Sequence, residues 1–87
     1  QVQAMQSQLS AMDRWVGKTH RLKRAAHVTP HAFAREIEEH TMEGNPLAHW
    51  YRHWAELRYR NPADEVAVAK LQRELTAAQK DAKDEMA

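Results

Sequence analysis

Three prolines divide this chain of 87 residues, and each one follows a residue whose side chain can cap a helix. The pairs are Thr29-Pro30, Asn45-Pro46 and Asn61-Pro62. A threonine or asparagine oxygen accepts hydrogen bonds from the free N–H groups of a first helical turn. Proline suits the first helical position and disrupts a helix interior. The spacing therefore predicts four helices, one before the first proline and one beginning at each pair.

The residues between these breaks favour helix throughout. Ala, Gln, Glu, Lys, Arg and Leu are abundant, only two glycines occur, and no stretch alternates apolar and polar residues as a strand does. We therefore expect an all-α fold, with residues 1–87 forming a single helical domain. Because the chain begins with Gln1 rather than Met, inside a helical pattern, we expect it to be a fragment of a longer chain.

The first and last helices carry narrow apolar seams. The first is predicted over residues 2–27 and the last from residue 62 onward, each about 25 residues or roughly 37 Å long. Their apolar side chains recur at alternating steps of three and four, which is typical of a helix that faces one other helix. These are Val2, Met5, Leu9, Met12, Val16 and Thr19, then Val68, Leu71, Leu75, Ala78 and Ala82. We expect these two long terminal helices to pair as an antiparallel hairpin, with two short helices at one end.

The two short helices differ in character. The one that follows Pro30 has an inner stripe of Phe33, Ile37, His40 and Thr41, and Gly44 is suited to end it. The one that follows Pro46 has a wide face made of Leu47, Trp50, Tyr51, Trp54 and Leu57. Because aromatic side chains bury large areas, this face is predicted to dominate the core.

No arrangement of residues predicts catalysis. The chain has no cysteine, and its serines and threonines lie in no activation motif. His49, His53 and Glu56 share a helix face at metal-ligand spacing, but Arg52 and Arg60 beside them disfavour a cation. We therefore predict no enzyme, no catalytic residue, no cofactor, no small-molecule substrate and no metal site. Zinc at His49 and His53 is the alternative left open.

A basic segment runs through the end of the first predicted helix and suits a phosphate backbone. It consists of Arg14, Lys18, Arg21, Lys23 and Arg24. These side chains can equally pair within the chain with the glutamates of the second helix, Glu36, Glu39 and Glu43. The net charge of only +1 argues against a dedicated polyanion binder. A small nucleic-acid-binding protein is therefore the alternative function.

The two seams favour a non-enzymatic adaptor that binds a protein partner or forms a homo-oligomer. The expected interface residues are Met5, Leu9, Met12 and Val16 on the first helix and Val68, Leu71 and Leu75 on the last. No apolar run approaches the roughly 20 residues of a membrane span, so no membrane contact is expected. The expected location is the cytoplasm.

Overall fold

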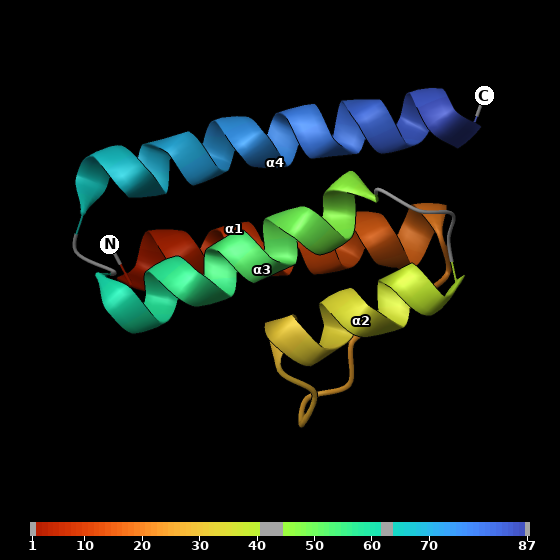
Figure 1. The fold of residues 1–87 in the computed structure, drawn as a ribbon, viewed down its shortest axis with the longest axis horizontal. Coiled ribbons are helices and arrows are strands. Elements are labelled where there is room, and N and C mark those ends of the chain that lie inside the picture. Colours follow the sequence, from red (N-terminus) through yellow and green to blue (C-terminus); the bar gives the residue numbers. More distant parts are fainter. Residues whose placement is uncertain (1, 41–44, 62–63, 87) are drawn as a thin grey trace.

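The computed structural model describes residues 2–40, 45–61 and 64–86, and these form four helices with no strand among them. The helices are α1 (Val2–Thr19), α2 (Pro30–His40), α3 (Pro46–Arg60) and α4 (Glu65–Met86), as Figure 1 shows. The prediction of an all-α chain with four helices is therefore confirmed. One buried apolar cluster draws side chains from all four.

The aromatic face of α3 holds the helices together. Trp50 donates its indole N–H to the backbone oxygen of Leu71 on α4, at 3.0 Å. Trp54 donates its own to the backbone oxygen of Met5 on α1, at 2.9 Å. Both indoles are almost fully buried, so each hydrogen bond satisfies a polar group that would otherwise be costly. The wide aromatic face is thus at the centre of the fold, with α3 touching each of the other helices.

The predicted antiparallel hairpin of the terminal helices is wrong. Figure 1 shows α1 and α4 running in the same direction, with α3 antiparallel to both. The contacts agree, because Gln8 bonds to Val68 and Met12 meets Gln79, so positions advance together along the two helices. Nor do the short helices sit at one end, since α3 runs alongside both long ones. An apolar seam specifies which face is buried and carries no information on direction.

The first helix is shorter than predicted, ending at Thr19 instead of residue 27. Arg21 has a φ of 55°, the left-handed conformation that commonly follows the last turn of a helix. Beyond it, Arg24 donates to the backbone oxygen of Val28 at 2.7 Å and pairs with Asp13. The left-handed residue at a helix end is usually glycine. Because this position holds an arginine, the sequence pattern did not predict that α1 ends here.

The first two predicted caps are confirmed. The Thr29 hydroxyl accepts from the N–H of Ala32 at 3.1 Å, at the start of α2. The Asn45 side chain accepts from the N–H groups of Leu47 and Ala48 at 2.7 and 3.4 Å, at the start of α3. Both caps lie beside the helix that they begin, so local sequence sufficed to predict them.

The third predicted cap is wrong. Asn61 ends α3, its N–H donating to the Leu57 oxygen at 2.9 Å. The residue that caps α4 is Asp64, whose carboxylate accepts from the N–H of Ala67 at 3.0 Å. His40 is also exposed instead of lying on the inner stripe of α2. Thr41, Glu43, Gly44 and Pro62 lie outside the described residues.

Candidate protein-binding groove

The predicted interface residues are buried inside the chain's own core. Each of the seven side chains is at most 5% exposed, and they pack in the one apolar cluster. They are Met5, Leu9, Met12, Val16, Val68, Leu71 and Leu75. A partner would reach them only if the helices separated, so their role in an interface stays a prediction. In the folded chain a binding surface has to be formed by other residues.

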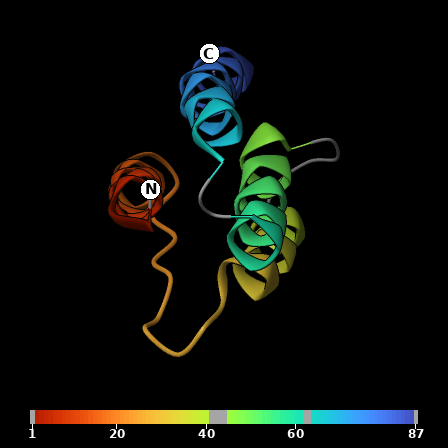
Figure 2. The same ribbon diagram turned by 90° about the vertical axis from the view of Figure 1, so that its left-hand side faces the viewer.

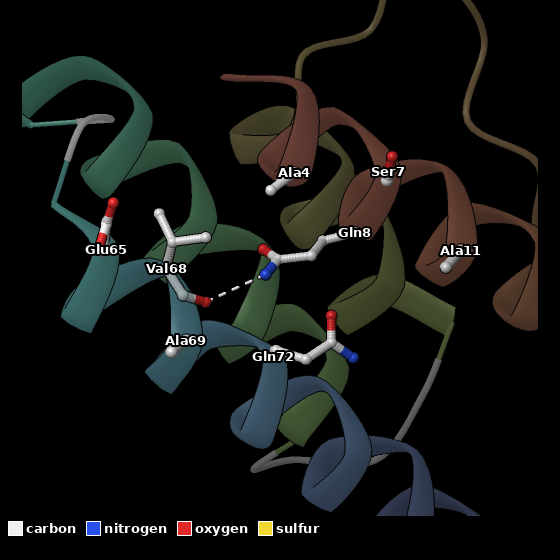
Figure 3. Close-up of a pocket in the computed structure, with 8 residues that line it drawn as sticks. All are labelled: Ala4, Ser7, Gln8, Ala11, Glu65, Val68, Ala69 and Gln72. Atoms are coloured by element: carbon white, nitrogen blue, oxygen red, sulfur yellow. Dashed lines mark hydrogen bonds between the residues drawn. The ribbon is translucent and has the colours of Figure 1, made fainter. Parts of the chain in front are cut away.

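Such a surface lies between α1 and α4, on the side away from α3 (Figure 2). An open groove of about 400 Å³ runs between the two helices. On α1 it is lined by Ala4, Ser7, Gln8 and Ala11, and on α4 by Glu65, Val68, Ala69 and Gln72, as Figure 3 shows. Four of these eight side chains are alanine or serine, so a partner backbone can approach the helices closely at those positions.

Gln8 forms the floor of this groove. Its side chain crosses from α1 toward α4, where Nε2 donates to the Val68 backbone oxygen at 3.0 Å (Figure 3). The residue is only 5% exposed, and its Oε1 accepts no hydrogen bond from any described residue. A buried acceptor left without a donor costs about 1–3 kcal/mol. Oε1 has almost no accessible surface in the folded chain, so a bound N–H or O–H group reaches it only if the Gln8 side chain turns toward the groove.

The exposed face of α1 beside the groove carries no charge. Residues 2–12 include no Lys, Arg, Asp or Glu, although Gln3, Gln6 and Ser10 face solvent. Protein surfaces are usually rich in charged side chains, and the centres of interfaces are depleted in them. Glu65 lies at one end of the groove, and Arg14 follows Ala11 by one turn toward the other. Sequence reasoning missed this surface, although the uncharged stretch was a visible signal.

The predicted basic segment is divided by the early end of α1. Arg14 and Lys18 lie on the helix, and Arg21 and Lys23 lie on the loop that follows. All four are exposed, and within the described part of the chain they form no ion pair. The alternative of pairing with α2 is thus not seen at the two described glutamates, Glu36 and Glu39. The depression nearby is lined by Asp13, Arg14, Gly17, Arg21, Lys23 and Arg24.

The fifth basic residue, Arg24, is engaged inside the fold. Its guanidinium pairs with Asp13 at 3.0 Å, and the Tyr51 hydroxyl donates to the same carboxylate at 2.6 Å. Burial raises the pKa of Tyr51, and the donation to Asp13 raises it further. Asp13 thereby ties the loop after α1 to both α1 and α3. This contact could not be predicted from local sequence patterns, because the residues that Asp13 contacts are 11 and 38 positions away.

The predicted set of His49, His53 and Glu56 is not brought together as the sequence pattern suggested. His53 Nδ1 lies 3.0 Å from an Oε2 of Glu74 on α4, and the His49 and His53 rings are 4.2 Å apart. The acidic neighbour of His53 is therefore Glu74, whereas Glu56 is exposed. Among the described residues, no group of three such side chains is arranged to hold a metal ion.

One hydroxyl lies next to an imidazole, as a nucleophile lies next to its base. Thr19 Oγ1 is 2.8 Å from His20 Nδ1, and it also donates to the Trp15 backbone oxygen at 2.8 Å. Because the hydroxyl proton goes to that carbonyl, His20 is left to donate to the oxygen and cannot withdraw its proton. The pair therefore stabilises the end of α1 and does not form an activated nucleophile.

Comparisons with known proteins found no matching family model, and no curated protein or solved structure was similar to the chain. None of the helices in the described part combines the length and the apolar content needed to cross a membrane.

Proposed function

We propose that this chain is a non-enzymatic helical interaction module whose binding surface is the groove between α1 and α4. The observation that carries the proposal is Gln8, a buried amide with an unsatisfied acceptor on the floor of an open, small-residue groove. Such acceptors are rare in folded proteins. Because Oε1 is covered in the single chain, we expect the Gln8 side chain to turn toward the groove when a partner supplies an N–H or O–H donor.

The shape and polarity of the groove favour a helix as the bound element. Two parallel helices align their dipoles unfavourably, whereas an antiparallel neighbour interacts favourably with both. On the inner side α3 already provides such a neighbour. On the outer side the small side chains of Ala4, Ala11 and Ala69 leave room for another. A helix bound there would complete a four-helix arrangement around α1 and α4.

Site-specific photo-crosslinking in the full-length protein, in its native host, tests this proposal. A photoreactive residue in place of Ser7, in the groove, is expected to give a discrete protein adduct, because a bound helix contacts that position. The same residue in place of Ala32, exposed on the distant α2, is the matched control and should give none. Filling the groove by Ala69→Trp should abolish the adduct at Ser7. Equal labelling from both positions, or an adduct that survives Ala69→Trp, would refute the proposal.

We also propose that the chain has no enzymatic activity and binds no cofactor. The Thr19 hydroxyl, the one nearest to an imidazole in the described part of the chain, is held by a backbone carbonyl, which supports it. A cytoplasmic location is also part of the proposal, and the absence of cysteine is compatible with it, as with any other compartment.

Nucleic-acid binding is the second candidate function, and the free basic residues favour it. Arg14, Lys18, Arg21 and Lys23 remain exposed without ion pairs in the described part of the chain. Titration with labelled DNA and RNA at low salt is expected to show binding that weakens steeply as salt rises. Replacing these four by alanine should abolish it, whereas Lys70→Ala on α4 should not. Dissociation constants weaker than about 100 μM for both nucleic acids would exclude this function.

A further inference from the structure

We propose that the depression beside the C-terminal end of α1 is a binding site for a phosphate monoester, held by Arg14, Arg21 and Lys23. The depression has a volume of about 480 Å³, within the range of small-molecule sites. It shares none of its lining residues with the groove between α1 and α4. It is therefore a separate site, and the inference goes beyond the proposed function.

The charges around the depression are unbalanced. Its lining includes four cationic side chains and one carboxylate. The carboxylate, Asp13, is already paired with Arg24 at 3.0 Å. Arg14, Arg21 and Lys23 are exposed and have no ion-pair partner among the described residues. Three like charges around one hollow repel one another, and an anion bound between them removes that repulsion.

A phosphate monoester matches these three cations better than a phosphodiester does. At neutral pH a monoester carries a charge of about −1.5 to −2 and has three free oxygens that accept hydrogen bonds. Each diester of a nucleic-acid backbone carries a single negative charge and has fewer free oxygens. Guanidinium groups bind phosphate oxygens in pairs, so two arginines and a lysine suit a group with three of them.

Gly17 leaves room for the ligand on the helical wall of the depression. It lies inside α1, where glycine is less favourable than alanine. Among the described residues outside α1, an added Cβ would come within 4 Å only of the Leu22 backbone oxygen, at 4.0 Å, which is an ordinary contact. The packing of the chain therefore does not require a glycine, whereas a ligand in the depression gains the space.

Arg21 also occupies a position where another residue would be more stable. Its φ of 55° is a left-handed conformation, which glycine adopts without strain and arginine does not. Strained backbone of this kind is concentrated at binding sites, where the surrounding fold holds it in place. Gly17 and Arg21 thus both lower the stability of the chain, and both line the same depression.

The loop that carries Arg21 and Lys23 is held in place before a ligand binds. Arg24 joins it to α1 through Asp13 and donates to the Val28 backbone oxygen at 2.7 Å, so binding requires little ordering of the backbone. The C-terminal end of α1 has a partial negative charge that opposes an anion, so the attraction comes from the side chains alone. Because these cations are exposed to water, we expect a dissociation constant of about 1 mM.

Titration of the isotope-labelled chain with methyl phosphate, followed by NMR, tests this inference at about pH 7.5, where the monoester is mostly a dianion. The backbone amide signals of Gly17, Arg21 and Lys23 should shift and saturate. Dimethyl phosphate, which represents the nucleic-acid backbone, should bind at least about tenfold more weakly. Inorganic phosphate, titrated in parallel, should bind about as tightly as methyl phosphate.

Arg21→Gly is the most informative variant, because the site loses a cation while the fold is expected to become more stable. It should raise the melting temperature and weaken methyl phosphate binding about tenfold, as the loss of one charge-assisted hydrogen bond does. Arg14→Ala should weaken binding to a similar extent. The matched control is Arg58→Ala, exposed on α3 and outside the depression, which should have no effect.

Four results would each overturn the phosphate monoester site. They are no saturating shift up to about 20 mM methyl phosphate, equal weakening by Arg58→Ala, dimethyl phosphate bound as tightly as methyl phosphate, and inorganic phosphate bound at least about tenfold more tightly. The third result would favour a nucleic-acid backbone as the ligand, and the fourth would show that the depression has no room for the ester group. The crosslink at Ser7 involves none of these residues, so it tests the groove separately.

Discussion

Replacing Gln8 by methionine tests the central residue of the groove. Methionine has the same unbranched length and a similar helix propensity, so it preserves the shape of the side chain. The variant loses the hydrogen bond from Nε2 to Val68, which contributes about 1 kcal/mol. The Val68 oxygen keeps its partner within α4, because it also accepts the N–H four residues later. The loss is therefore confined to that single hydrogen bond.

The same replacement removes the unsatisfied Oε1, whose burial costs about 1–3 kcal/mol. The net expectation is a folded chain more stable by about 1 kcal/mol, which corresponds to a melting temperature higher by about 4–8 °C in a domain of this size. The adduct from the photoreactive residue at position 7 should weaken at the same time, because the acceptor for the bound partner is gone. Greater stability with weaker binding is the signature of a polar residue kept for function.

Thermal and guanidinium denaturation followed by helical circular dichroism measures the stability of the isolated chain. The control is Gln8→Glu, which has the same shape but brings a charge into a site that is 5% exposed. It should lower the stability markedly. If Gln8→Met instead destabilises the chain by more than about 1 kcal/mol, Oε1 already has a partner, and the reasoning about the groove fails.

Three further predictions concern the rest of the fold. Asp13→Asn should lower the free energy of unfolding by about 2 kcal/mol in guanidinium titrations, because Arg24 keeps a half-buried charge without its counterion. Arg21→Gly should raise it by about 1 kcal/mol, since glycine adopts the φ of 55° without strain; a destabilised variant would contradict this. Glu38 hydrogen-bonds to Arg52, which holds the pKa of that carboxyl below its ordinary 4.5. Its contribution is therefore present above pH 4.5 and lost as the pH falls through the lowered pKa, so Glu38→Gln should flatten the acid limb of a stability–pH curve.

Local signals in the sequence predicted the features that depend on neighbouring residues. Thr29 and Asn45 cap the helices that begin one residue later, because the hydrogen-bonding partners of a cap lie two or three residues away. The third pair misled because Asn61 serves the helix before it and Asp64, two residues past Pro62, supplies the cap for α4. The existence of α4 could be predicted from the sequence, but the residue at which it begins could not.

The candidate site was less accessible to sequence reasoning than the fold. The seams correctly marked buried positions, but burial inside one chain and burial against a partner give the same apolar pattern. The groove depends on which side of α1 faces α4, and that follows from the packing of both helices against α3. No sequence pattern singled out Gln8, because its significance lies in the hydrogen bond that its Oε1 lacks in the folded chain.

The sequence by itself determined that this chain is helical, where three of its four helices begin to within a few residues, and which faces are buried. These properties follow from backbone geometry and from the periodic exclusion of apolar side chains from water, both of which act over a few residues. Only the tertiary structure decided that α1 and α4 run parallel, that α1 stops at Thr19, and that a groove with a buried acceptor lies between the two helices. Those features depend on contacts such as Asp13 with Tyr51 and Gln8 with Val68, which join residues 38 and 60 positions apart.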